Sequence, residues 1–239
     1  MKHLVITLLI SLGLLLFTHM SAGDSSKALM TAAPAQTTGE ASLDFDQQLL
    51  AIQQSWSVNN YQLQDAAQVA AFETLLAQTA QLTQDYPKRA EAWVWQGITQ
   101  STFAGIKGGL GALSLAKAAK KSLETAIDLD PVVLAGSAFT SLGTLYHKVP
   151  GWPVGFGNKD KARVMLEKAL EISPNGIDAN YFYGEFLFDE GDYDLAMRHL
   201  QLARQAPARL GRELADAARQ TEITELLQRL DAKRGKEKG

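Results

Sequence analysis

The chain of 239 residues contains no cysteine and only four histidines. The lack of cysteine excludes disulfides, thiolate zinc sites, iron–sulfur clusters and cysteine nucleophiles, and we expect no lipoprotein anchor on a cysteine. Two of the histidines, His3 and His19, lie at the extreme N-terminus. Catalysis that needs several imidazoles is therefore disfavoured.

An excess of positive charge is also lacking, since 23 basic and 26 acidic residues give a formal net charge of −3. A nucleic-acid-binding protein normally carries a basic face, so we expect no nucleic-acid partner.

The Gly105–Gly111 stretch lacks the Gly-Lys-Ser/Thr ending of a phosphate-binding loop. The acidic residues of 189–194 lack the spacing of a calcium-binding loop. We therefore expect neither a cofactor nor a metal.

A long apolar run occurs at the N-terminus. Leu4–Phe17 is uncharged, follows Lys2 and precedes the small residues of 21–23. This is the layout of a secretory signal peptide, whereas a membrane-spanning helix needs about 20 apolar residues. We predict a signal peptide over residues 1–23 and a flexible leader over 24–42, with a retained membrane anchor as the alternative.

From residue 43 onward, apolar residues recur at helical spacing and no segment alternates as a strand does. Three segments, Ala119–Ala126, Ala162–Ala169 and Ala196–Ala203, share the pattern Ala-x-x-x-Leu-x-x-Ala. A helical segment with one glycine precedes each of them, and a proline follows each of them. These intervals are similar to those of the tetratricopeptide repeat, a helix–turn–helix of about 34 residues.

We therefore predict an all-α protein, a tetratricopeptide-like α-solenoid of helical hairpins with a C-terminal capping helix, over residues 43–239. Repeat units are expected at about 90–131, 135–174 and 177–207, and the cap helix at about 213–233. Glycine on the first helix and alanine on the second let the two helices approach closely, and proline ends the second helix. A final amphipathic helix covers the last repeat.

Two insertions separate the helices of their repeats, at Ala104–Gly111 and Val149–Gly157. Insertions in a solenoid usually lie on one face, often the binding face. The second insertion contains Pro-Gly-Trp-Pro at 150–153. Either this block is a rigid turn in which Trp152 plugs a gap between helices, or Trp152 and Phe156 line an apolar pocket or pore.

The segment Asn180–Phe186 is rich in aromatic residues. On a helix, Asn180 and Gly184 face the partner helix, whereas Tyr181 and Glu185 point elsewhere, to the concave surface. Phe182 and Phe186 are better explained as packing residues.

Arg-Leu-Gly-Arg-Glu at 209–213 leads into the final helix. Arg209 or Arg212 either pairs in a bidentate manner with a carboxylate of a ligand or partner, or belongs to a linker in which Glu213 favours the start of the helix.

The Pro-Gly-Trp-Pro block and the Arg-x-Gly-Arg-Glu segment together resemble the TatT family. These proteins are periplasmic tetratricopeptide-type components associated with tripartite ATP-independent periplasmic (TRAP) transporters. The resemblance runs from about Trp93 to Leu227. It implies a periplasmic adaptor that docks a TRAP solute-binding protein, has a largely apolar pore and associates as trimers. The pore is expected to hold or pass a small hydrophobic or carboxylate-bearing ligand.

The residues predicted to line the ligand site or pore are Pro150, Gly151, Trp152, Pro153, Phe156, Asn180, Tyr181, Tyr183 and Glu185. Arg209 and Arg212 are expected to contact an anionic group or the partner. The alternative function is a cell-envelope assembly scaffold that grips a peptide or protein in its concave face. A hydrolase needs a nucleophile beside a base, for which this sequence leaves little room, so we predict no catalytic residues.

Overall fold

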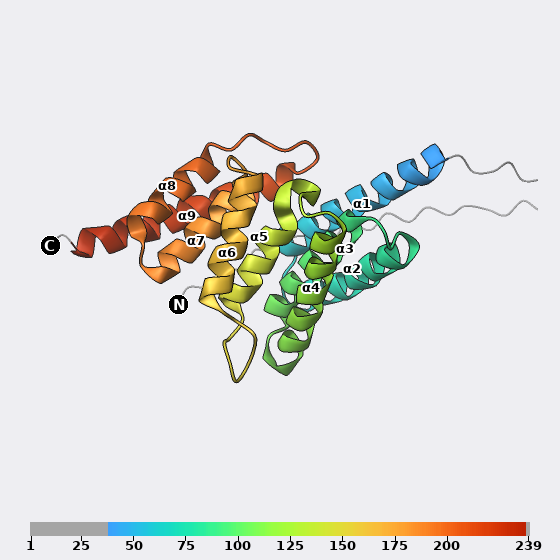
Figure 1. Cartoon of the computed structure of the whole chain (residues 1–239), viewed down its shortest axis with the longest axis horizontal. Coiled ribbons are helices and arrows are strands. Elements are labelled where there is room, and N and C mark those ends of the chain that lie inside the picture. Colours follow the sequence, from blue (N-terminus) through green and yellow to red (C-terminus); the bar gives the residue numbers. More distant parts are fainter. Residues whose placement is uncertain (1–37, 238–239) are drawn as a thin grey trace, which may run out of the picture. The chain divides into compact units, whose positions relative to one another are not determined.

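The computed structural model describes residues 38–237 (Figure 1). These residues form helices without a β-strand, which confirms the predicted all-α class. The helices of the described part are α1 (Thr38–Tyr61), α2 (Asp65–Asp85), α3 (Ala90–Lys107), α4 (Gly109–Leu129), α5 (Val133–Lys148), α6 (Lys159–Ile172), α7 (Ile177–Glu190), α8 (Tyr193–Arg204) and α9 (Glu213–Glu237).

Successive helices pack as hairpins. The closest pairs are α3 with α4, α5 with α6 and α7 with α8 (Figure 1). A further pair, α1 with α2, precedes them. The confirmed architecture is an α-solenoid of tetratricopeptide type.

The repeated glycines explain how closely the hairpin helices approach. A Cβ atom added at Gly97, Gly143 or Gly184 would lie 2.6, 2.7 or 2.9 Å from the Cγ atom of a leucine on the second helix. Those leucines are Leu123, Leu166 and Leu200, the central residues of the repeated Ala-x-x-x-Leu-x-x-Ala pattern. All three leucines are fully buried. The same glycine–leucine contact therefore fixes the distance between helices in all three hairpins.

Three hydrophobic clusters stabilise the described part of the chain, and the smallest contains Phe139, Ala169 and Ala179. One joins α1, α2 and α3 through large aromatic residues such as Phe45, Phe72 and Phe103. The largest runs from α3 to α9 and contains the repeat leucines. Residues of α3 belong to both of these clusters. The hydrophobic core is therefore continuous from the first hairpin to the three repeats.

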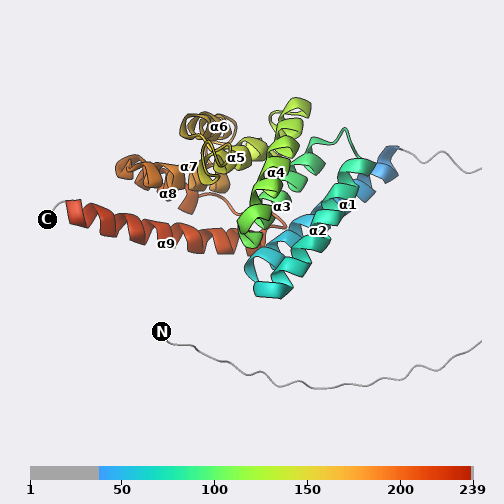
Figure 2. The same cartoon turned by 90° about the horizontal axis from the view of Figure 1, so that it is seen from below.

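Helix α9 does more than cover the last repeat. It packs against α7 and α8, and it also contacts α1, at the other end of the helix order (Figure 2). Near this contact, Gly211 has a φ of +73°, and a Cβ at this position would lie 3.4 Å from Cδ1 of Leu50. Helices α1 and α9 of the described range are thus in direct contact.

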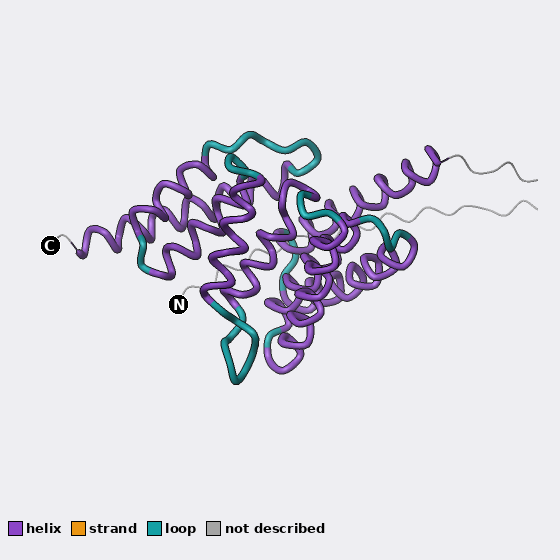
Figure 3. The backbone as a smooth tube through the Cα atoms, viewed as in Figure 1, coloured by secondary structure: helices purple, strands orange, loops and turns teal. Residues whose placement is uncertain are grey.

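The two insertions take different forms. The first does not form a loop: it lengthens α3 and α4, which are separated by Gly108 alone. The second is a projecting loop between α5 and α6, seen below α6 in Figure 1 and as a teal loop in Figure 3. Its ends are held by a bridge between Gly151 and Gly157 and by a 3.0 Å hydrogen bond from Gly157 N to Pro150 O.

The predicted signal peptide lies outside the described residues, as does most of the predicted leader. Helix α1 begins at Thr38, before the expected start of the domain at residue 43. None of the helices in the described range is both long and apolar enough to cross a membrane.

Candidate ligand cavity

A cavity of about 660 Å³ lies among α1, α3, α5, α7 and the first turns of α9. Its size is within the range of small-molecule sites. The residues that line it are Gln53, Trp56, Tyr61, Trp95, Ile98, Ser101, Thr102, Gly105, Leu134, Ala135, Ser137, Thr140, Ser141, Thr144, Leu145, Lys148, Asp178, Phe182, Arg209, Arg212, Ala215 and Arg219.

Aromatic rings form one wall of the cavity. Trp56 of α1 and Trp95 of α3 meet edge to face, with ring centroids 6.0 Å apart. The indole N–H of Trp56 donates to Oγ1 of Thr102 over 3.1 Å, which fixes the orientation of the ring. Phe182 of α7 extends the apolar surface. Such a wall favours a ligand with an apolar body.

A stripe of hydroxyl residues on α5 also lines the cavity. Ser137, Thr140, Ser141 and Thr144 lie on one face because they are spaced by three or four residues. Ser137 and Thr144 donate their hydroxyl hydrogens to helix carbonyls, over 2.6 Å to Leu134 O and 2.9 Å to Thr140 O. These two hydroxyls therefore present acceptor oxygens to the cavity.

Helix α5 begins with a left-handed turn at the cavity. Leu134, Ala135 and Gly136 have φ values of +46°, +53° and +76°. This conformation costs a residue with a side chain about 1–2 kcal/mol. Leu134 and Ala135 both line the cavity, so the strain is located at the candidate site, as is common at functional sites.

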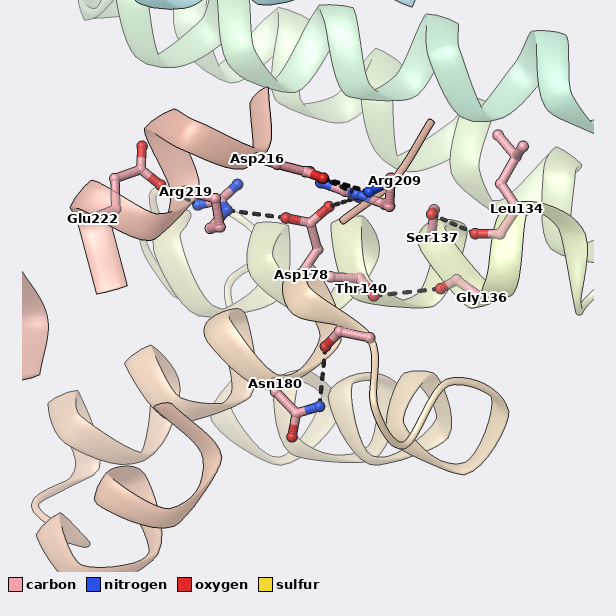
Figure 4. A network of polar contacts seen from close by, with 11 residues as sticks. Leu134, Gly136, Ser137, Thr140, Asp178, Asn180, Arg209, Asp216, Arg219 and Glu222 are labelled. Atoms are coloured by element: carbon pink, nitrogen blue, oxygen red, sulfur yellow. Dashed lines mark hydrogen bonds and ion pairs between the residues drawn. The ribbon is translucent and has the colours of Figure 1, made fainter. Parts of the chain in front are cut away.

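Ion pairs close the end of the cavity formed by α7 and α9. Asp178 of α7 lies between two arginines, with Oδ2 2.6 Å from Nη1 of Arg209 and Oδ1 2.9 Å from Nε of Arg219 (Figure 4). Arg209 also pairs with Asp216 at 2.5 Å, and Arg219 also pairs with Glu222. Through these ion pairs, the segment after α8 and the first turns of α9 both bind to α7.

The network keeps its charges at neutral pH. Burial alone would raise the pKa of Asp178, but Arg219 and Arg209 outweigh it and hold that pKa below its usual value. Burial likewise opposes the charged form of Arg209, yet Asp178 and Asp216 raise its pKa. The carboxylate and the guanidinium groups therefore stabilise each other in their ionised forms.

Arg212 is a cation without such a partner. Its guanidinium lies over the indole of Trp95, with Cζ 4.9 Å from the ring centroid. Its Nε atom is buried and has no hydrogen-bond partner in residues 38–237. Burial and the neighbouring Arg209 lower its pKa. The indole N–H of Trp95 is likewise buried and lacks an acceptor within the described helices.

The structure places only part of the predicted site at this cavity. Arg209 and Arg212 line it, although Arg209 is already paired with Asp178 and Asp216. Residues 150–153 and Phe156 are not among the lining residues. Trp152 at the tip of the projecting loop is 90% exposed, so it neither plugs a gap between helices nor lines this cavity. Phe156 packs edge to face on Tyr146 at 5.8 Å.

The predicted residues of α7 have other contacts. The side-chain amide of Asn180 donates to Pro174 O at 2.8 Å and Gly176 O at 3.0 Å, which anchors the preceding turn. Tyr183 donates to Oε1 of Glu167 at 3.0 Å. Glu185 pairs with Lys148 at 3.2 Å. Tyr181 is buried, with the guanidinium of Arg219 4.3 Å from its ring centroid. None of these four residues lines the cavity.

Sequence reasoning missed most of the lining residues. Phe182, which we assigned to packing, lines the cavity, and so do Trp56 and Trp95. The sequence does contain a signal, because the hydroxyl stripe of α5 places polar residues on one face of an otherwise apolar helix. A search for that pattern would have identified α5 as a wall of a site.

The described part of the chain contains no cluster of histidine and acidic residues that could hold a metal ion. The arrangement is instead a cavity with aromatic and hydroxyl walls and an ion-pair network at one end, and among the residues that line it Arg212 has no ion-pair partner in the described range. Such a site can bind a small ligand.

Comparison with known proteins agrees with the fold. A tetratricopeptide repeat family matches residues 155–220. A thermophilic TPR protein of Thermus thermophilus is similar in structure, with a TM-score of 0.50 and 14% identity over 75% of this chain and 98% of that one. This chain has a tetratricopeptide fold. Proteins of this fold are typically non-catalytic scaffolds, so the fold suggests a protein–protein interaction adaptor.

Two other solved structures align less closely. MamA has 18% identity and a TM-score of 0.41, over 70% of this chain and 91% of that one. The Pseudomonas aeruginosa pilF protein has 16% identity and a TM-score of 0.34, over 78% and 93%. The search of curated proteins gives no match to this sequence.

Proposed function

We propose that this tetratricopeptide protein is a periplasmic adaptor of the TatT type. It docks a solute-binding protein of a TRAP transporter, and its cavity holds or passes a small ligand with an apolar body. The resemblance to the TatT family supports the periplasmic location and the solute-binding protein as the partner. The observation that carries the ligand-binding part is the cavity of about 660 Å³, walled by Trp56, Trp95 and Phe182.

The partner and the ligand are expected to use different surfaces. The projecting loop exposes Trp152 by 90% and Val154 by 65%, and its hydrogen-bonded base presents these side chains at little entropic cost. Exposed tryptophan on an ordered segment is typical of interface hot spots. The cavity lies apart from this tip, because none of the residues 150–157 lines it.

The ligand-binding part is tested by filling the cavity. We expect Ser141→Trp to place an indole in the cavity and to exclude the ligand. Native mass spectrometry of protein purified from the periplasm measures the result: the wild type carries a small adduct and the variant does not. The matched control is Ser114→Trp on α4, where the side chain is exposed and outside the cavity.

Three results would contradict this part. One is a wild-type protein without any adduct, another is an adduct that survives Ser141→Trp, and the third is loss of the adduct in Ser114→Trp as well. A bound peptide in place of a small molecule would favour the assembly scaffold. The same spectra report whether the protein is a trimer, as the TatT resemblance implies.

The docking part is tested at the loop tip. We expect Trp152→Ala to weaken binding to the TRAP solute-binding protein by at least tenfold, since truncating an interface tryptophan costs about 2 kcal/mol or more. Isothermal titration calorimetry with the solute-binding protein measures this affinity. Ser141→Trp is the control, because it leaves the tip unchanged. Equal affinity of Trp152→Ala and the wild type would show that the tip is not the docking site.

A further inference from the structure

We propose that the cavity selects an uncharged polyol, an elongated molecule with an apolar edge and at least two hydroxyl donors about 10 Å apart. Ser137 and Thr144 of α5 are the residues that accept hydrogen bonds from these donors. This inference rests on the proposed ligand-binding function and adds the chemical class of the ligand. That class differs from the carboxylate-bearing ligand implied by the resemblance to the TatT family.

Three hydroxyl groups of the cavity have already used their hydrogens. Ser101 of α3 and Ser137 and Thr144 of α5 each donate to a backbone carbonyl of their own helix, over 2.9, 2.6 and 2.9 Å. Figure 4 shows this bond for Ser137. All three residues line the cavity and are partly exposed. A hydroxyl oxygen that has donated its hydrogen can still accept one, so these groups are acceptors for a ligand.

Hydrogen-bond donors on the ligand suit these hydroxyls better than acceptors do. To donate to a ligand, each hydroxyl would have to give up the bond to its helix, so no hydrogen bond would be gained. A purely apolar ligand would exclude water from the same oxygens and leave them without a donor, which costs free energy. A ligand O–H keeps the helix bond and adds a second one. The hydroxyl groups therefore favour a ligand with O–H donors.

The positions of Ser137 and Thr144 set the distance between these donors. The two residues are seven positions apart in the sequence, which corresponds to two turns of α5 and about 10 Å along its axis. One ligand hydroxyl cannot reach both oxygens, because a hydrogen bond spans about 3 Å. The ligand is therefore elongated and carries polar groups along one edge. Its other edge meets the rings of Trp56 and Phe182, which favour C–H groups.

The charged groups of the cavity do not require a charged ligand. Asp178 is paired with two arginines, and Lys148 is paired with two carboxylates at 3.2 and 3.0 Å. Burial lowers the pKa of Arg212, whereas Asp178 and Asp216 raise it. These two carboxylates thus already compensate the charge of Arg212. An uncharged ligand leaves these interactions as they are.

Four probes with a chain of eight carbons test this inference: 1,8-octanediol, 1-octanol, 1,8-dimethoxyoctane and octanoate. Isothermal titration calorimetry on the full chain, purified from the periplasm and freed of its native ligand, measures each affinity. A plain apolar cavity would bind the diol less tightly than octanol or the diether, because the diol loses the most hydration. We expect the opposite order, with the diol at least fivefold tighter than any other probe, as one additional net hydrogen bond predicts.

Removing one acceptor at a time tests the two hydroxyls. Thr144→Val keeps the shape of the side chain and is expected to weaken binding of the diol about fivefold, and Ser137→Ala is expected to do the same. Octanol should change by no more than about twofold in either variant, because its single hydroxyl can bind the remaining oxygen.

The matched control is Thr125→Val on α4. Thr125 makes the same kind of bond, over 3.0 Å to Lys121 O, but does not line the cavity. This variant is expected to bind all four probes as the wild type does. Thermal unfolding shows whether each variant folds. If one of the two cavity variants does not fold, the other variant and the order of the probes on the wild type decide.

The outcomes distinguish this inference from the function on which it rests. Tighter binding of octanol or the diether than of the diol would overturn the selection of donors and leave the cavity as an apolar ligand site. A diol that binds most tightly, but equally well to Thr144→Val, Ser137→Ala and the wild type, would overturn the role of the two hydroxyls. Tighter binding of octanoate than of the diol would overturn the preference for an uncharged ligand.

The native adduct decides if no probe binds. If Ser141→Trp then keeps the adduct, the ligand-binding function fails together with the inference. If Ser141→Trp loses the adduct, the ligand-binding function stands, and the adduct is identified by tandem mass spectrometry. A carboxylic acid, or a molecule with fewer than two exchangeable hydrogens, would overturn the inference, whereas an uncharged polyol would support it.

Discussion

Asp178→Asn is expected to lower the free energy of unfolding by about 2 kcal/mol, less than the loss for a fully buried ion pair, because the Asp178 side chain is 30% exposed. The substitution keeps the size of the side chain but removes the charge shared by Arg209 and Arg219. Both guanidiniums would then remain partly buried with less compensation. Urea denaturation at neutral pH, followed by circular dichroism, measures the loss.

The matched control for Asp178→Asn is Asp128→Asn on α4, an exposed carboxylate with no ion pair in the described residues. We expect it to change stability by less than about 0.5 kcal/mol. The pH dependence provides a second check. Because the pKa of Asp178 is lowered in the folded protein, its contribution is present above the unfolded pKa and is lost as pH falls through the folded pKa. The difference between wild type and Asp178→Asn should therefore shrink in acid. A constant difference would contradict the ion-pair explanation.

Gly143→Ala is expected to destabilise the protein by about 2 kcal/mol, although alanine is the better helix former. A Cβ at this position would lie 2.7 Å from Cγ and 3.1 Å from the backbone nitrogen of Leu166. The backbone of α6 would have to move away from α5, and overpacking of this kind usually costs about 1–3 kcal/mol. Chemical denaturation measures the change in the midpoint.

Gly105→Ala is the control for Gly143→Ala, because Gly105 is also a helical glycine but has no atom within 4 Å of an added Cβ. There, the lower entropy of the unfolded chain and the better helix propensity should stabilise the protein by about 0.5–1 kcal/mol. The two substitutions thus have opposite expected signs. Destabilisation by both, to a similar degree, would show that the contact with Leu166 is not the cause.

The hairpins could be predicted because their determinants repeat in the sequence. Gly97, Gly143 and Gly184 each precede an Ala-x-x-x-Leu-x-x-Ala segment, and the structure places each glycine against the leucine of that segment. A pattern that occurs three times at similar intervals is unlikely to arise by chance, so it could be recognised from the sequence alone. The hairpin of α1 and α2 lacks this pattern, so the sequence indicated helices there without assigning them to a repeat.

The cavity could be predicted only in part, because its walls come from distant segments. Arg209 and Arg212 were identified as anion contacts from their local spacing, and both reach the cavity. One partner of Arg209, however, is Asp178, which is 31 residues away in the sequence. No local pattern links them. The large exposure of Trp152 was also beyond local reasoning, since the same Pro and Gly residues suit a buried turn and a projecting loop equally well.

The contact between α1 and α9 changes how the domain is expected to unfold. In an open solenoid each repeat contacts only its neighbours, so the terminal repeats can unfold first and independently. Here the final helix packs against the first one as well as against α7 and α8. Loss of either end removes a contact that stabilises the other end. The helices of this domain are therefore expected to unfold together in one cooperative transition, and the cavity between them persists until that transition.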